Sequence, residues 1–299
     1  SSSKPLPRRT ARSSVWIEIA ESDLNQPFFF APKIKTGIGE NYFFGGMLGF
    51  DDGIVEFRRV HNQIQLLWRN TEFIARPGSP EAFAVSAAFS PSLLASAAVA
   101  SQPHPERKSF LIEANAIFVA DLTGIASQLQ RSYRQGYAFD SRNSAITALR
   151  NSPEATTIEV LNHFATGSIA AAQPGQAGGT APSSPRSLPD ARSLFMTMHY
   201  TLARLPAQPL RPRMADARVG HFTVSVVDFA DDIARNPRQR YVSRWNLQKK
   251  DPSAALSEPV KPITFWIDRT VPLKYRAAVT DGVLEWNKAF EAIGISNAL

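Results

Sequence analysis

The alternation of apolar and polar residues predicts short strands through most of the chain. Ile54–Val60 and Ile64–Trp68 alternate on either side of a polar break that starts at His61, which is the pattern of a β-hairpin. Glycines at close intervals between residues 37 and 53 are typical of turns between short strands. Four further segments have the composition of strands: Phe110–Val119, Thr156–Phe164, Phe195–Leu205 and His221–Phe229.

Helical patterns are fewer. Phe83–Ala100 is rich in alanine and predicts a helix interrupted at Pro91. Asp121–Arg134 predicts a second helix, because its apolar residues fall on one face and Asp121 is placed to cap it. Ala170–Pro189 is rich in alanine, glycine, serine and proline, so we expect a mobile loop there between two strands that pair.

The pattern changes near the end of the chain. Three prolines, of which Pro252 is the first, predict an extended connector, and Ile263–Ile267 then predicts a strand. From Tyr275 to Ile293 apolar residues recur every three or four positions, which predicts one face of a long amphipathic helix. Gly294 follows in the position that a helix C-terminal cap prefers.

These patterns divide the chain into three parts and predict an α+β fold. Residues 1–14 are expected to be a disordered arm, residues 15–251 a β-rich domain with a few helices, and residues 252–299 a connector and an incomplete α/β unit. One strand and one helix do not complete a fold, because their apolar faces need partners. We therefore expect truncation or proteolytic processing after Leu299.

The net charge raises the possibility of a nucleic-acid partner, and its distribution argues against one. The chain of 299 residues carries a net charge of +7. Between Arg204 and Lys250, ten Lys or Arg residues stand against four Asp, which gives 10 − 4 = +6. This stretch has no helix-turn-helix, RNA-binding or single-strand-binding signature. A solvated basic surface or docking face explains it better, so no nucleic acid is predicted as a partner.

The absence of cysteine restricts both the chemistry and the compartment. Without cysteine the chain has no thiol nucleophile, cysteine–zinc cluster or disulfide. There is no apolar run long enough to span a membrane, and residues 1–12 do not form an intact signal peptide. We expect a periplasmic or extracellular protein whose signal peptide is absent from this chain.

No catalytic, cofactor-binding or metal-binding residue is predicted. No two of the five histidines are three to five residues apart, and no His-Glu-x-x-His or Gly-x-Ser-x-Gly motif occurs. His199 and His221 lie in strand-like segments and could face each other across a sheet, although two ordinary sheet histidines are the simpler interpretation. The adjacent carboxylates Asp51–Asp52 and Asp231–Asp232 suit turns better than acid–base catalysis, because neighbours on a strand point to opposite faces.

Two stretches resemble a known family. Arg204–Pro206 with Pro212–Phe222 is similar to a segment of large bacterial secreted zinc metalloproteases. Tyr241–Pro252, which leads into Ser257–Ile263, and then Trp286–Gly294 resemble the connector of that family and the opening strand and helix of its metzincin-like protease domain. The resemblance covers most of the chain, and its specific part lies in the last hundred residues.

The resemblance implies a non-catalytic N-terminal portion of a zinc-dependent metallopeptidase. The zinc-binding helix of the family would follow Leu299, so no catalytic residue is carried onto this chain. Ile263–Ile267 would be the first strand of the zincin sheet and Tyr275–Ile293 its backing helix. The implied cofactor is zinc in the missing C-terminal part, and the implied partners are that catalytic part and a peptide or protein substrate.

Two non-enzymatic alternatives stay open. The chain could be an inhibitory or folding pro-segment, in which a carboxylate such as Asp216 blocks the zinc, although a turn in which Asp216 is ion-paired to a neighbouring arginine is simpler. It could also be a peptide- or glycan-binding β-domain, on the evidence of the aromatic residues Trp16, Tyr42 and Trp68, although core positions are the stronger explanation for these residues.

Overall fold

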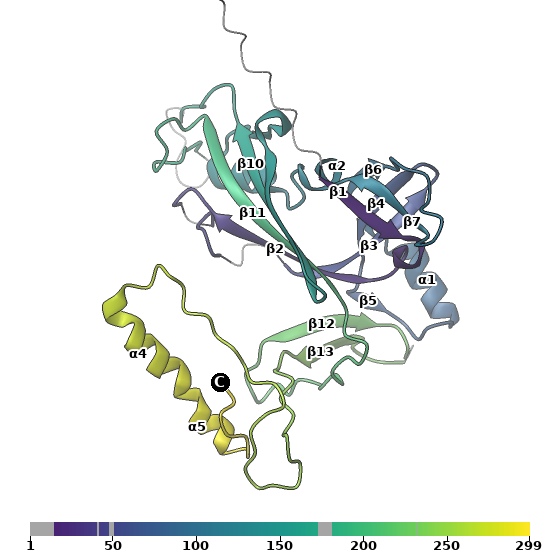
Figure 1. The fold of residues 1–299 in the computed structure, drawn as a ribbon, viewed down its shortest axis with the longest axis vertical. Coiled ribbons are helices and arrows are strands. Elements are labelled where there is room, and N and C mark those ends of the chain that lie inside the picture. Colours follow the sequence, from purple (N-terminus) through teal and green to yellow (C-terminus); the bar gives the residue numbers. More distant parts are fainter. Residues whose placement is uncertain (1–14, 41, 48–50, 173–180, 232) are drawn as a thin grey trace, which may run out of the picture. The chain divides into compact units, whose positions relative to one another are not determined.

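The computed structural model describes residues 15–299 except 41, 48–50, 173–180 and 232 (Figure 1). The chain divides into two compact units. The first comprises Ser1–Pro209 and Val227–Arg235, and the second comprises Leu210–Val226 and Asn236–Leu299. The predicted disordered arm lies outside the described residues.

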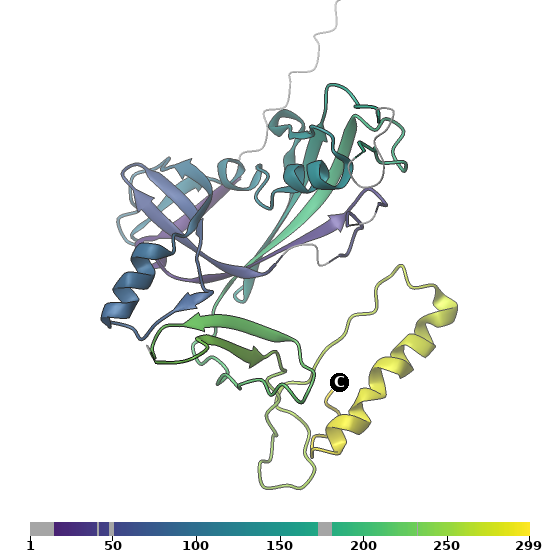
Figure 2. The same cartoon turned by 180° about the vertical axis from the view of Figure 1, so that it is seen from behind.

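The first unit is built on one curled antiparallel sheet (Figures 1 and 2). The strand order is β6-β4-β3-β2-β11-β10-β8, and β9 also pairs with β10. The strands are β2 (Phe28–Thr36), β3 (Gly53–Val60), β4 (Gln63–Trp68), β6 (Ser92–Ala98), β8 (Ala138–Phe139), β9 (Ala145–Asn151), β10 (Ala155–Ala165) and β11 (Ser193–Arg204).

Smaller elements complete this unit. β1 (Trp16–Ala20) pairs with β7 (Ser109–Glu113) in a separate two-stranded sheet, and Val227 and Asp228 pair in parallel with β5 (Phe73–Ile74). The helices are α1 (Pro80–Ala88), α2 (Ala114–Phe118) and α3 (Ile125–Tyr133), with the short 3-10 turns η1 (Glu21–Asp23) and η2 (Ser141–Asn143).

The hydrophobic core of the first unit is large and rich in aromatic residues. Phe30 from β2 and Tyr200 from β11 are fully buried and stack with their ring centroids 5.7 Å apart. Trp68 meets Phe30 edge to face at 5.9 Å, and Phe118 from α2 meets Tyr200 at the same distance of 5.9 Å. The alternation in the sequence therefore directs one face of each long strand into a common core.

Several predicted elements are confirmed. β3 and β4 form the predicted hairpin, with Val60 opposite Gln63. β10 and β11 pair antiparallel along their full length, so the predicted loop at Ala170–Pro189 connects paired strands; residues 173–180 of it lie outside the described residues. α3 starts later than predicted, and Asp121 accepts hydrogen bonds from the N–H groups of Ile125 and Ala126 at 2.7 and 2.9 Å.

Two predictions in this unit are wrong in part. Phe83–Ala100 is helical only as far as Ala88 in α1, after which β6 pairs with β4. Phe110–Val119 is a strand only as far as Glu113, and α2 follows with Ala114, Ile117 and Phe118 buried. Short apolar runs are compatible with a strand and with a buried helix alike, so tertiary packing decides between them.

The second unit has few strands and an exposed helical end. It contains β13 (Arg238–Val242), which lies next to β12 (Thr223–Asp228), and the helices α4 (Leu273–Leu284) and α5 (Trp286–Glu291). The predicted long helix thus forms with a break at Glu285. Gly294 has a φ of +87°, as the predicted cap requires.

The cap is a complete Schellman motif. The N–H of Gly294 donates to the carbonyl of Glu291, and the N–H of Ile295 donates to the carbonyl of Phe290, both at 2.9 Å.

The predicted strand at Ile263–Ile267 is wrong. These residues pair with no strand in the described part of the chain, although the N–H of Ile263 donates to the carbonyl of Ala298 at 2.7 Å. A strand needs a neighbour to satisfy its backbone groups, and the pattern of side chains alone cannot supply one. Across the described ranges, no helix has the length and apolar character needed to span a membrane.

Candidate binding cleft

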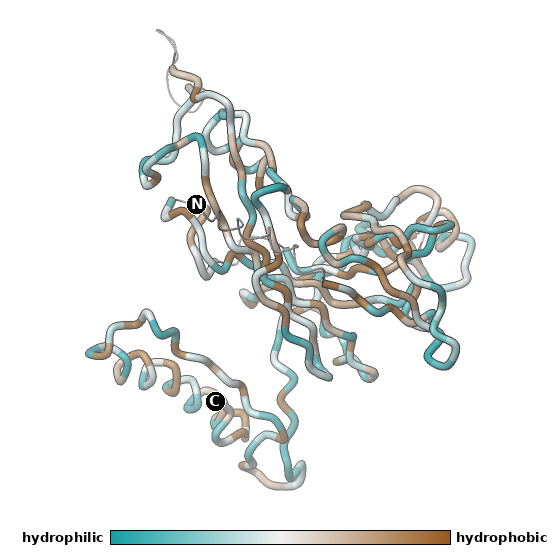
Figure 3. Tube along the Cα trace, turned by 45° about the horizontal axis from the view of Figure 1, so that its top comes forward, coloured by the Kyte–Doolittle hydropathy of each residue, from teal (hydrophilic) through white to brown (hydrophobic). Residues whose placement is uncertain are grey.

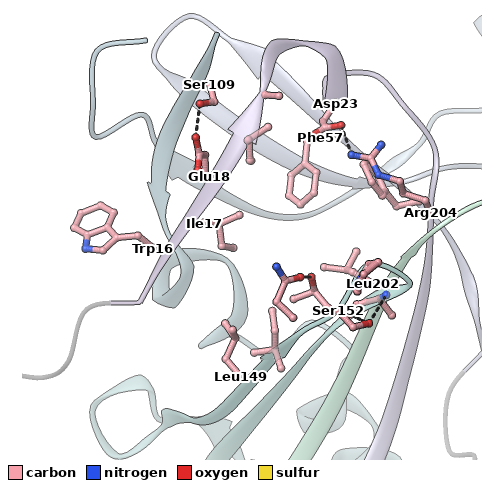
Figure 4. Close-up of a pocket in the computed structure, with 18 of the residues that line it drawn as sticks. Trp16, Ile17, Glu18, Asp23, Phe57, Ser109, Leu149, Ser152, Leu202 and Arg204 are labelled. Atoms are coloured by element: carbon pink, nitrogen blue, oxygen red, sulfur yellow. Dashed lines mark hydrogen bonds and ion pairs between the residues drawn. The ribbon is translucent and has the colours of Figure 1, made fainter. Parts of the chain in front are cut away.

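The first unit has an open cleft of about 650 Å³ beside β1 (Figure 4). Its wall is assembled from segments far apart in the sequence: β1, η1, the start of β7, and parts of β2, β3, β9, β10 and β11. Antiparallel pairing of the long strands brings these segments together. The volume lies in the range of natural ligand sites.

The floor of the cleft is apolar. Phe28 and Phe57, from neighbouring strands, meet edge to face with their ring centroids 6.0 Å apart. Ile158 and Leu202 continue this surface along β10 and β11, and Leu149 of β9 is 43% exposed beside it. An apolar floor open to solvent favours binding of apolar side chains.

One polar group at the rim is a fixed carboxylate. Glu18 of β1 accepts hydrogen bonds from Ser109 Oγ at 2.5 Å and from Arg107 Nε at 2.6 Å. These two bonds, that from Ser109 above all, hold the pKa of Glu18 below its ordinary value. The carboxylate therefore stays ionised and is already engaged, which makes it a poor general base.

A second ion pair lies at another part of the rim. Arg204 Nη2 of β11 donates to Asp23 Oδ1 at 2.8 Å, and the guanidinium lies 5.6 Å from the ring centroid of Phe28. The turn between β9 and β10 forms the opposite wall, where Ser152 Oγ and the N–H of Ala155 are 3.1 Å apart. The polar groups that line the cleft are thus largely paired with each other, which suits binding rather than bond cleavage.

A Ser–His–Asp arrangement occurs elsewhere in the first unit. His163 Nδ1 lies 3.1 Å from Asp140 Oδ2, and His163 Nε2 lies 2.8 Å from Ser193 Oγ. Acyl transfer also needs N–H donors for the oxyanion, and the N–H of Ser193 is bonded to the carbonyl of Asp190 at 3.2 Å. None of the three residues lines the cleft. We interpret these three side chains as a structural clamp, because their hydrogen bonds link β10 to β11 and to the residue that follows β8.

The described residues offer no ligand set for a zinc ion. Among the described residues, no group of three or more His, Asp or Glu side chains could hold a metal. His199 of β11 is flanked by Glu159 of β10 and Lys33 of β2, so its cross-strand neighbours do not include His221. His199 Nδ1 lies 3.6 Å from Glu159, which is a structural contact inside the sheet.

Asp216 forms an ion-paired turn with Arg218, which is the simpler of the two roles predicted for it. Its carboxylate binds Arg218 through Nη2 at 2.6 Å and Nε at 3.0 Å, and these bonds lower its pKa to about 2. The N–H of Val219 donates to the carbonyl of Asp216 at 3.0 Å, which closes the predicted ion-paired turn.

The three aromatic residues considered for ligand binding have different environments. Trp16 lines the cleft and is 48% exposed, and Tyr42 is 73% exposed. Trp68 packs against the core through Phe30. Apart from Trp16, no cleft residue was predicted to bind a ligand. Glu18 and Ser109, for example, meet only through the pairing of β1 with β7.

A second cavity, of about 440 Å³, lies in the second unit. It is lined by residues of the connector, of α4 and of the chain end, among them Val260, Ile263, Phe265, Val283 and Leu284. The segment around it is strongly exposed: Trp266 is 92% exposed and Trp286 is 65% exposed. This unit thus leaves much of its apolar surface uncovered.

Comparison with protein families found one family whose sequence model matches this chain. The model of a family described as domain of unknown function DUF5117 matches residues 46–250. The chain belongs to the DUF5117 family, since the match covers about two thirds of it. Comparisons with curated proteins and with solved structures found no match.

Proposed function

We propose that this chain is the non-catalytic N-terminal portion of a zinc-dependent metallopeptidase, and that it braces or regulates a catalytic part of the same protein. The proposal is supported by the resemblance of residues 241–252, 257–263 and 286–294 to the connector and first elements of a zincin protease domain. The match to the DUF5117 family ends at residue 250, next to the predicted start of that connector.

The observation that carries the proposal is the uncovered apolar face at the end of the second unit. Leu273 is 79% exposed and Ile293 is 68% exposed, in addition to the two tryptophans at 266 and 286. Figure 3 shows apolar residues recurring along α4 and α5. Large exposed apolar surfaces in soluble proteins mark interaction sites. A catalytic part that packs on this face would also give Ile263–Ile267 a neighbour.

The chemistry of the proposed enzyme belongs to that catalytic part. The described residues offer no zinc site, so no step of peptide hydrolysis is assigned to them. In such enzymes the zinc ion lowers the pKa of a bound water and polarises the peptide carbonyl. The contribution of this chain would be the packing surface on α4 and α5. The proposed location is periplasmic or extracellular, and the proposed substrate is a peptide or protein.

The test compares the full-length gene product with residues 1–299. Zinc is measured by elemental mass spectrometry and peptidase activity by hydrolysis of fluorescein-labelled casein. We expect about one zinc per full-length protein and hydrolysis that a chelator abolishes, and neither property in residues 1–299. A full-length product without zinc and without hydrolysis would contradict the proposal.

Variants test the packing role of the exposed face. Trp286→Ala should lower the specific activity of the full-length product at least tenfold and release residues 1–299 more readily after limited proteolysis. Leu210→Ala, at an exposed residue of the same unit that lies outside the helical face, is the matched control and should leave both unchanged. Equal activity of the parent protein, Trp286→Ala and Leu210→Ala would show that this face does not support the catalytic part.

A further inference from the structure

One edge of β1 has no partner strand among the described residues. In the described part of the chain β1 pairs with β7 alone. The N–H of Glu21 donates to the carbonyl of Lys108 at 2.9 Å, and the N–H of Ala114 donates to the carbonyl of Val15 at 2.8 Å. In an antiparallel pair, hydrogen-bonded and non-hydrogen-bonded positions alternate. Odd-numbered residues of β1 therefore direct their backbone groups towards β7.

The even-numbered residues direct their backbone groups the other way. Trp16, Glu18 and Ala20 each present an N–H and a C=O to the side of β1 opposite β7. Within the described ranges, no hydrogen bond joins these groups to another element. All five residues of β1 line the cleft. Figure 4 shows Ile17, Phe57, Leu202 and Ser152 around the space beside the strand.

We propose that the cleft binds an extended polypeptide segment, which adds to β1 as a further strand. Three pairs of outward backbone groups at strand spacing are complementary to a peptide backbone, and a partner could exchange up to about six hydrogen bonds with them. Alternate side chains of the bound segment lie over the apolar floor at Phe28, Phe57 and Leu202. This inference does not depend on the proposed peptidase function.

The charges of the cleft define the chemistry of the segment. Glu18, Asp23 and Glu154 line it together with Arg107 and Arg204, which gives a net of 2 − 3 = −1. With so small a net charge, backbone hydrogen bonds and apolar contacts dominate the recognition. The preferred ligand is a neutral or weakly basic segment with an apolar residue at every second position, and its binding depends little on salt.

The test uses residues 1–299 and a fluorescein-labelled peptide of sequence Lys-Val-Thr-Val-Thr-Val-Lys. Its binding is followed by fluorescence anisotropy. A matched peptide carries N-methyl groups on the amides of one strand edge, which removes donors and keeps the side chains. We expect saturable binding of the first peptide and at least tenfold weaker binding of the second, with less than a twofold change in Kd between low and physiological salt.

A substitution on the protein side removes a single outward donor. Ala20 has a φ of −77°, close to the value that proline requires, so Ala20→Pro removes its N–H without straining β1. Binding should weaken at least tenfold, whereas Ala20→Ser, which keeps the N–H, should bind as the parent does. Circular dichroism and the thermal midpoint confirm that both variants are folded.

Three results would overturn the proposal: no binding of the peptide, equal binding of the methylated peptide, or equal binding by Ala20→Pro. Light scattering after gel filtration tests for another occupant of the edge. A dimer of the parent protein that Ala20→Pro converts to a monomer would mean that a second copy of the chain covers β1, and would also overturn it.

Discussion

The two units use similar apolar residues in opposite ways. In the first unit, Phe30, Phe118 and Tyr200 are fully buried in a shared core. In the second unit, Trp266 and Trp286 stay exposed, and no residue of this unit belongs to the hydrophobic core cluster among the described residues. The first unit thus encloses its own apolar surface, whereas the second presents apolar surface that another protein part can cover.

Apolar residues of the first unit therefore contribute to the stability of its fold, whereas those of the second unit contribute to the binding of a partner. Burial of an aromatic side chain stabilises a fold by several kcal/mol, whereas an exposed one contributes little until a partner covers it. Mutations in the first unit should therefore change folding, and mutations in the second should change assembly.

The largest expected effect is a loss of stability in the core of the first unit. Phe30→Ala removes a buried ring that contacts both Trp68 and Tyr200, and it should lower the free energy of unfolding by about 3–5 kcal/mol. Urea unfolding followed by circular dichroism measures the change. Trp286→Ala is the control from the second unit, where the exposed ring should contribute less than about 0.5 kcal/mol. Similar losses for both variants would remove the distinction between the units.

A smaller effect is expected at the turn that ends α5 in the second unit. Gly294→Ala places a Cβ 2.6 Å from the carbonyl oxygen of Ala255, at a φ of +87°, and should cost more than about 1 kcal/mol. Gly282→Ala in α4 meets no atom within 4 Å and should stabilise the helix by up to about 1 kcal/mol. Amide hydrogen exchange over residues 273–299 should rise in the first variant and fall in the second. A fall in both would mean that the cap does not hold the helix end.

The smallest effect concerns acid stability. A hydrogen bond from Asn143 above all, together with His163, lowers the pKa of Asp140 to about 2, below its unfolded value of about 3.9. This carboxylate therefore stabilises the fold above about pH 4, and the contribution is lost as the pH falls from 4 to 2. Asp140→Asn should flatten the decline of the thermal midpoint in that window.

Asp216→Asn is the matched control for the acid effect. The pKa of Asp216 is also lowered to about 2, but its partner Arg218 is only two residues away, so much of the pair can persist in the unfolded chain. We expect little change in its acid profile. A larger change for Asp216→Asn than for Asp140→Asn would contradict the clamp role of Asp140.

Local sequence patterns predicted the elements that local chemistry determines. The β3–β4 hairpin, the cap at Gly294 and the cap at Asp121 all depend on residues a few positions apart. The errors at Phe83–Ala100 and Ile263–Ile267 have a different origin. In the first, pairing with β4 converts an alanine-rich run into a strand; in the second, no partner strand exists among the described residues.

The cleft could not be predicted from the sequence for the same reason. Glu18 and Arg107 are separated by 89 positions, and Asp23 and Arg204 by 181. Only the register of β1 with β7 and of β2 with β11 brings them together. The sequence did show that the chain contains no His-Glu-x-x-His or Gly-x-Ser-x-Gly motif, because a motif is itself a local pattern.

The position of β2 has a consequence for how this family is delimited. β2 lies between β3 and β11 in the sheet, yet it precedes residue 46, where the match to DUF5117 begins. A recombinant fragment cut to the family boundaries would lack this strand and would split the sheet into two parts. The segment that sequence similarity defines is therefore smaller than the autonomous folding unit, and expression trials should begin before Trp16.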